Sequence, residues 1–321
     1  MMCVLRKIRL VFLLSAILMI TVGNAHAFTP APRFENGFSF FDGSTIVNRT
    51  DGSEITLGQY ILSWTGDDAI LTIPAELGGA MMGHLESGAV KNCDTITTVI
   101  LPDSSMAIFG GSFRNCPNLE TAIIHDKLRI SSNPFVECPS LREFILDENA
   151  EHFGLVEGNL YDLKTMTLLT PGQSASGDYS VPEGTKIIAA MAYFGRQEAE
   201  SVALPDGLLY IGSNAFDSCV NLQEITFPNT LLSIAPLAFY RCENLENLVL
   251  PPSLEAIGNG AFAGCSKLTS VEIPPSVSQI GITAFRECPN IQLTVEKGSY
   301  AEEWAIETGV ACVEKGIDCV I

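Results

Sequence analysis

Cysteine is the residue type in this chain with the widest range of chemistry, because a thiol can form a disulfide, bind a metal or act as a nucleophile. Seven of the ten cysteines share one position of an internal repeat, and Arg196 takes that position in one further copy. A small hydrophobic side chain that recurs in one position is typical of a core, so we predict buried free thiols. Pairing is the alternative, because adjacent coils would place these Cα atoms about 5 Å apart. The seven are Cys93, Cys116, Cys138, Cys219, Cys242, Cys265 and Cys288.

Two further cysteines, Cys312 and Cys319, lie outside this repeat position and are the better candidates for a disulfide. If the segment that holds Cys3 is removed on export, nine cysteines remain. An odd number leaves at least one thiol unpaired within a monomer.

Patterns for catalysis or metal binding do not occur in the sequence. His84, His125 and His152 have no metal-ligand spacing with one another or with the cysteines. Nucleophile-elbow, P-loop and H-E-x-x-H patterns are also missing. The glycine-rich segment 78–83 lacks a lysine and predicts a turn. The sequence therefore predicts no enzymatic activity, no cofactor and no metal site.

The elements that carry the cysteines repeat every 23 residues. A short fixed period of apolar positions predicts stacked coils that bury one face against their neighbours. Counting the copies by their cysteine position, with Arg196 in one of them, gives eight recognisable coils. The clearest columns are Ile211, Ile234, Ile257 and Ile280; Ala215, Ala238, Ala261 and Ala284; and Phe216, Phe239, Phe262 and Phe285.

The pattern of apolar residues predicts that each coil contains one short strand and one compact return. Leu222, Ile225 and Phe227 alternate as in a strand, and Pro228 ends it. A second set of apolar residues has helical or 3₁₀ spacing, which predicts a tight turn that returns the chain. This set contains Ile211, Ala215, Phe216 and Cys219.

The repeat template divides the chain into six segments. We expect a signal peptide over 1–27, an N-terminal β cap over 28–64, repeats over 65–146, an insertion or irregular coil over 147–178, repeats over 179–296 and a C-terminal cap over 297–321. Ser299 and Glu302 form a capping-box pattern that begins a helix, and Gly309 ends it. Trp304 lies on the apolar stripe of this helix and is expected to anchor the cap.

The first 27 residues combine a basic start, a 13-residue apolar run over 10–22 and the small-x-small sequence 25–27. This pattern predicts an export signal; an uncleaved anchor is the alternative. The segment carries three basic and no acidic side chains, so the formal charge of −19 becomes −19 − 3 = −22 after cleavage. Such a charge disfavours nucleic acid as a partner and attracts cationic patches on a protein; solvation of a secreted protein is the alternative.

Strand residues that point away from the core form a row along the repeats and are the candidate protein-binding face. The first half of this row is β-branched and apolar, which favours a protein-binding patch. Simple strand propensity on a solvated face is the alternative. The row contains Ile100, Ile123, Ile145, Ala203, Thr226, Val249 and Glu272.

The unit I-G-x-x-A-F-x-x-C-x-x-L-x-x-I-x-[IF]-P, seen over 234–251 and 257–274, resembles the BspA-like leucine-rich repeat family. The resemblance covers roughly residues 65–295 and extends to 298–305, which is similar to a closing segment of such proteins. It implies a leucine-rich-repeat-like, right-handed stack of 22–23-residue coils with one parallel β-sheet face and short helical or 3₁₀ returns, capped at both ends. It also implies an exported or surface-displayed protein with a role in adhesion or protein binding.

Two functions follow as hypotheses. The first is a secreted or surface-exposed, non-catalytic module that binds a host extracellular protein or a microbial surface protein. The second is a structural component of the cell envelope that binds copies of itself. The sequence predicts no membrane span after residue 28.

Overall fold

A computed structural model describes residues 32–41, 45–47, 54–56, 60–173 and 177–315. The expected signal peptide, which includes Cys3, and Cys319 lie outside these residues. The chain divides into two compact units. In the described part of the smaller unit, β3 (Thr45–Val47) and β4 (Glu54–Thr56) form an antiparallel pair.

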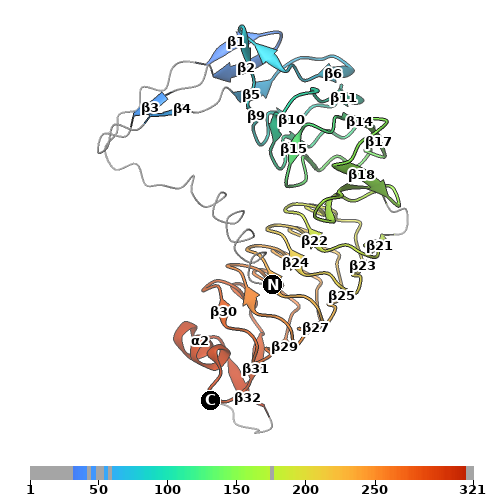
Figure 1. Ribbon diagram of the computed structural model, residues 1–321. Helices are drawn as coiled ribbons and strands as arrows, with labels where there is room; N and C mark the ends of the chain where they lie inside the picture. Colours follow the sequence, from blue (N-terminus) through green and yellow to red (C-terminus); the bar gives the residue numbers. More distant parts are fainter. Residues whose placement is uncertain (1–31, 42–44, 48–53, 57–59, 174–176, 316–321) are drawn as a thin grey trace. The chain divides into compact units, whose positions relative to one another are not determined.

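The larger unit is a β-solenoid of about 11 turns in which parallel strands recur about every 23 residues, as the sequence predicted (Figure 1). In its C-terminal half, each complete coil contributes to two ladders rather than one. The first ladder contains β22 (Ile187–Ile188), β24 (Tyr210–Ile211), β26 (Ser233–Ile234), β28 (Ala256–Ile257) and β30 (Gln279–Ile280). The second contains β21 (Asp178–Ser180), β23 (Ser201–Ala203), β25 (Glu224–Thr226), β27 (Leu248–Val249), β29 (Ser270–Glu272), β31 (Gln292–Val295) and β32 (Cys312–Glu314).

The N-terminal half begins with an antiparallel meander that continues into a parallel ladder. This sheet runs β1 (Arg33–Glu35), β2 (Phe38–Phe41), β5 (Tyr60–Trp64), β9 (His84–Leu85), β12 (Ala107–Ile108) and β15 (Arg129–Ile130). A second sheet holds β6 (Ile70–Thr72), β11 (Thr98–Ile100), β14 (Thr121–Ile124) and β17 (Glu143–Leu146). A third holds β10 (Val90–Lys91), β13 (Phe113–Arg114) and β16 (Phe135–Val136), and β7 (Glu76–Leu77) pairs with β8 (Ala80–Met81).

Between β17 and β21, where the sequence predicts an insertion or irregular coil over 147–178, an antiparallel meander interrupts the repeat. It consists of β18 (Phe153–Val156), β19 (Asn159–Asp162) and β20 (Thr167–Thr170). Strand β20 then pairs in parallel with β22 and starts the first ladder of the C-terminal half. The meander thus provides the edge on which the second set of coils stacks.

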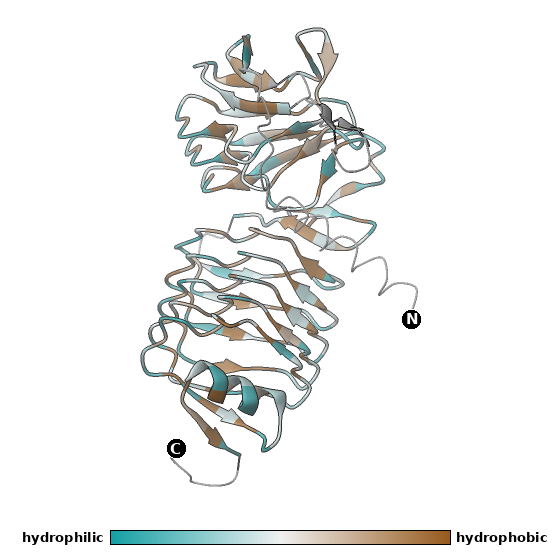
Figure 2. Ribbon diagram, turned by 90° about the vertical axis from the view of Figure 1, so that its left-hand side faces the viewer, coloured by the Kyte–Doolittle hydropathy of each residue, from teal (hydrophilic) through white to brown (hydrophobic). Residues whose placement is uncertain are grey.

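The core consists of columns of identical side chains, one from each coil, and hydrophobic segments recur along the stack (Figure 2). The rings of Tyr193, Phe216, Phe239, Phe262 and Phe285 stack face to face with centroids 4.8–5.5 Å apart. The ends of this column are closed edge-on by Tyr179 and Trp304. Parallel stacking and continuous burial of these rings join successive coils through this column.

The compact returns are built from single 3₁₀-type turns rather than from a continuous helix. Cys219 N donates to Phe216 O within its coil, but Ser218 N donates to Tyr240 O in the next coil. Backbone N–H groups thus alternate between the turn and the inter-coil ladder, so helical hydrogen bonds do not propagate. Positive φ angles at Asn214 and Ser218 also break the helical path.

Helix α2 (Tyr300–Thr308) lies between β31 and β32 in the chain and packs on the last coil. Ser299 accepts a hydrogen bond from Glu302 N, and Gly309 adopts the left-handed conformation that ends the helix. Glu302 reaches the backbone N–H of Gly298, one residue before the position that a standard capping box uses. Trp304 is buried against Phe285, as the sequence predicted.

Candidate binding surfaces

The apolar half of the predicted row is an in-register stripe on the second sheet of the N-terminal half. Ile100 of β11, Ile123 of β14 and Ile145 of β17 are paired partners across the sheet. The residue that precedes each of them on its strand is buried, so these three side chains lie on the outer face. Ile145 is 43% exposed, whereas Ile100 and Ile123 are half-buried.

Sequence reasoning missed one residue of this surface. Ile70 of β6 is 60% exposed and lies in the adjacent row, as the register partner of Thr98. Residues 71–74 repeat the strand end of the template, but Thr65 takes the cysteine position before them, so counting coils by cysteine leaves out this strand and Ile70.

The second half of the predicted row lies on the C-terminal coils and is more polar. Thr226 is exposed on β25, and Val249 on β27 is 80% exposed. Glu272 on β29 is the register partner of Val249, and its carboxylate forms an ion pair with Lys315. Lys315 lies outside the repeats, so the repeat pattern does not predict this ion pair.

The two halves of the row belong to different sheets, whereas sequence analysis expected one continuous row. Strand β17 is the edge of one sheet and β21 is the edge of another. The β18–β20 meander follows β17 in the chain, so the face consists of two patches.

The repeat cysteines are scaffold residues. All eight cysteines in the described residues are free, and six of the seven in the column are buried; Cys93 is half-exposed. Each thiol from Cys219 to Cys288 donates to the carbonyl of the aromatic residue 26 positions earlier, at 3.1–3.3 Å. Burial raises the pKa of the Cys219 thiol to about 12 and that of Cys288 to about 11. Thiols with such pKa values are poor nucleophiles.

The histidines lie apart, each with its own carboxylate. His84 pairs with Glu86 and stacks between Tyr60 and Phe109. His125 pairs with Asp147, and His152 lies 3.4 Å from Asp162. Within the described residues, histidine, cysteine and carboxylate side chains do not assemble a group of three or more that could hold a metal.

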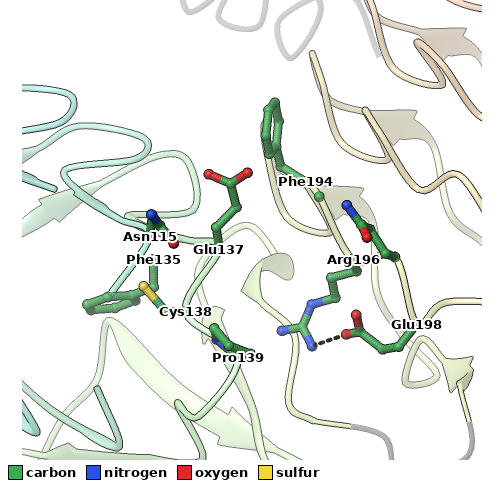
Figure 3. A pocket seen from close by; sticks show the side chains of 10 residues that line it. Asn115, Phe135, Glu137, Cys138, Pro139, Phe194, Arg196 and Glu198 are labelled. Atoms are coloured by element: carbon green, nitrogen blue, oxygen red, sulfur yellow. Dashed lines mark ion pairs between the residues drawn. The ribbon is translucent and has the colours of Figure 1, made fainter. Parts of the chain in front are cut away.

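A pocket of ≈ 270 Å³ opens where the return turns of two coils separate, and segments 135–139 and 194–198 line most of it (Figure 3). Arg196, in the position of the missing cysteine, lies at this pocket with only 14% of its side chain exposed. Its guanidinium donates to the carbonyl of Pro171 and to the side chains of Gln173 and Tyr179. Arg196 therefore fastens the end of the insertion to the first coil that follows it.

None of the helices in the described part of the chain is long and apolar enough to cross a membrane.

Several solved structures resemble the chain. Pneumococcal vaccine antigen PcpA is 16% identical with a TM-score of 0.49, and the alignment covers 89% of this chain and 99% of that one. A leucine-rich cell surface protein from Faecalibacterium prausnitzii is 19% identical with a TM-score of 0.45, covering 87% and 98%. The leucine-rich repeat protein of T. pallidum is 30% identical with a TM-score of 0.40, covering 44% and 67%.

Among curated protein sequences, none matches this chain. A family model does match it: six copies of the BspA type leucine rich repeat region cover residues 79–157 and 176–294. These segments hold most of the ladders and core columns described above. The chain belongs to the BspA-type leucine-rich repeat family.

Proposed function

We propose that this protein is an exported, non-catalytic binding module, secreted or displayed at the cell surface, that recognises a partner protein through the outer face of its strands. The observation that carries the proposal is the in-register stripe of Ile100, Ile123 and Ile145, with Ile70 in the adjacent row. Four strands of one sheet hold these apolar side chains on one face, where a partner can bury them together.

The chemistry around the C-terminal patch favours a partner with basic groups. Glu224 on β25 is exposed beside Thr226, and Glu200 precedes β23 in the adjacent coil. Neither carboxylate has an ion-pair partner among the described residues. With a net charge of −19 for the whole chain, this surface attracts cationic groups and raises the rate of encounter.

The test uses the mature chain as immobilised bait for extracellular proteins of a host and for microbial surface proteins. We expect Ile123→Glu to leave the fold intact and to remove the captured partner, because the charge would be buried in the interface. The matched control is Ile282→Glu, since Ile282 is 78% exposed and lies on a return turn rather than on the strand face. Capture that survives Ile123→Glu, or that is lost equally with Ile282→Glu, would contradict the proposal.

A further inference from the structure

The return turns of neighbouring coils are joined by a regular set of three backbone hydrogen bonds. Before the interruption, Gly111, Phe113 and Asn115 donate their N–H groups to carbonyls of the next coil, at 2.9–3.0 Å. After the interruption, Met191, Tyr193 and Gly195 donate in the same way, at 2.7–3.0 Å. In each case the N–H belongs to the earlier coil and the carbonyl to the later one.

At the interruption only the first of these three bonds is made directly. Asn133 N donates to Ala190 O at 2.9 Å, and Ser132 and Ala190 form a parallel bridge. This pairing relates the two coils by 58 residues, so the register predicts bonds from Phe135 N to Ala192 O and from Glu137 N to Phe194 O.

The second bond is replaced by the side-chain amide of Asn133, which is inserted between the two coils. Its Oδ1 accepts from Phe135 N at 2.9 Å, and its Nδ2 donates to Ala192 O at 3.1 Å. Thr170 also donates to Oδ1, and Asn133 is buried. The Asn133 amide thus satisfies both Phe135 N–H and Ala192 C=O, which the separation of the coils keeps from bonding to each other.

The third bond has no such substitute. Within the described residues, Glu137 N–H and Phe194 C=O have no hydrogen-bond partner, although the register assigns them to each other. Both residues line the ≈ 270 Å³ pocket, on the two return turns that face each other across it (Figure 3). Glu137 is exposed, so water can satisfy these groups until a ligand displaces it.

We propose that this pocket binds one amide of an extended peptide segment from a partner protein. The peptide carbonyl would accept a hydrogen bond from Glu137 N–H, and the peptide N–H would donate one to Phe194 C=O. The peptide amide would thus bridge the two coils as the buried Asn133 amide bridges Phe135 N–H and Ala192 C=O. The strand that ends at the pocket, β16, is the edge of the three-stranded sheet β10-β13-β16, and sheet edges bind extended chains.

The walls of the pocket can hold the flanking parts of such a peptide. The ring of Phe194 lies under the Arg114 guanidinium, 5.0 Å from the ring centroid, and offers an apolar surface. Glu137 is held by Arg114 and Glu198 by Arg196, so both acidic groups on the rim are neutralised. Because these charges are paired, recognition in the pocket depends mainly on backbone hydrogen bonds. This favours a peptide as the ligand over a charged small molecule.

The test follows the backbone amide signal of Glu137 by NMR in the isotope-labelled full chain. The probes are N-methylacetamide, N-acetyl-trialanine N-methylamide and N-acetylglucosamine. We expect the capped tripeptide to shift the Glu137 signal and to bind about tenfold more tightly than N-methylacetamide, because it adds neighbouring contacts to the shared amide. N-acetylglucosamine, which carries the same amide on a sugar, should bind no more tightly than N-methylacetamide.

A pocket-filling variant tests the location. Gln197 is exposed and lines the pocket, so Gln197→Trp should abolish the shift. Val220 occupies the same turn position one coil later, away from the pocket, and Val220→Trp should leave binding unchanged. The proposal is overturned if the tripeptide leaves the Glu137 signal in place, if N-acetylglucosamine binds more tightly than the tripeptide, or if Gln197→Trp binds as well as Val220→Trp.

Discussion

At the scale of single residues, Asn133 is the polar side chain on which the connection between the two halves depends. Its amide takes part in four hydrogen bonds, with Phe135 N, Thr170 Oγ1, Met191 O and Ala192 O. Replacing it with Leu keeps the size and leaves those buried groups unpaired. We expect Asn133→Leu to lower the free energy of unfolding by about 2–4 kcal/mol in urea titrations.

Thr170→Val is the matched control, because it removes one of the same four hydrogen bonds and keeps the shape of the side chain. We expect it to cost about 1 kcal/mol. Equal losses for the two variants would show that Asn133 does not act as a bridge between the coils.

The thiol column gives the protein a pH dependence on the alkaline side. The Cys219 and Cys288 thiols have folded pKa values of about 12 and about 11, against 9.0 for an exposed thiol. A folded pKa above the unfolded one means that the stabilisation is complete below pH 9.0 and is lost as the pH rises toward 11 and 12. Each thiol contributes up to about 1.4 kcal/mol per pH unit in that window.

The measurement is the free energy of unfolding in urea across this pH range under reducing conditions. We expect the wild-type chain to lose stability more steeply with pH than the double variant Cys219→Ala and Cys288→Ala. Parallel pH curves would contradict the assignment of this loss to the two buried thiols.

These two cases differ in how far the sequence could predict them. The cysteine column was visible because seven residues share one repeat position. The role of Asn133 depends on its proximity to residues 190–192, which the insertion separates from it by 58 positions in the chain. A repeat period cannot predict a pairing that skips an insertion, so neither Asn133 nor the open Glu137 and Phe194 groups were identified.

At the scale of elements, the ends of the solenoid need protection because the last coil has no neighbour to cover it. Helix α2 supplies this cover through Trp304, whose ring lies edge-on to Phe285 with centroids 6.1 Å apart. We expect Trp304→Ala to lower the free energy of unfolding by about 3–5 kcal/mol. Hydrogen exchange should accelerate in β30 and β31 and stay unchanged in β22, because stability spreads mainly between adjacent coils.

Tyr300 provides the control on the same helix, since its side chain is 43% exposed. Tyr300→Ala should change stability by less than about 1 kcal/mol. If Trp304→Ala accelerated exchange equally in all coils, the cap would contribute to the whole cooperative unit rather than to its end.

The elements also show where pattern reasoning reaches its limit. The alternation of Leu222, Ile225 and Phe227 predicted the strand that the structure contains at 224–226. The helical spacing predicts that Ile211 belongs to the return, yet it lies in β24, a strand of the first ladder. A single inward residue per coil has no alternation of its own, so only the pairing between coils identifies this strand.

At the scale of the whole molecule, net charge separates the two functional hypotheses. The chain carries a formal charge of −19, and the isoelectric point of the sequence is ≈ 4.5. Two copies of such a chain repel each other at neutral pH, whereas a partner with basic groups is attracted. We therefore expect the mature chain to sediment as a monomer at neutral pH and to associate as the pH falls toward its isoelectric point, where the net charge vanishes.

Ile123→Glu makes this measurement decisive, because the substitution places a charge in the centre of the apolar stripe. A wild-type chain that assembles at neutral pH, and an Ile123→Glu variant that does not, would assign the strand face to contacts between copies and favour the envelope-component hypothesis. If the chain is a monomer and its binding to a basic partner weakens with added salt, the strand face is assigned to binding another protein. Added salt weakens such binding because it screens the attraction between exposed charges. Ionic strength should have the opposite effect on self-association, because the same screening removes the repulsion between acidic copies.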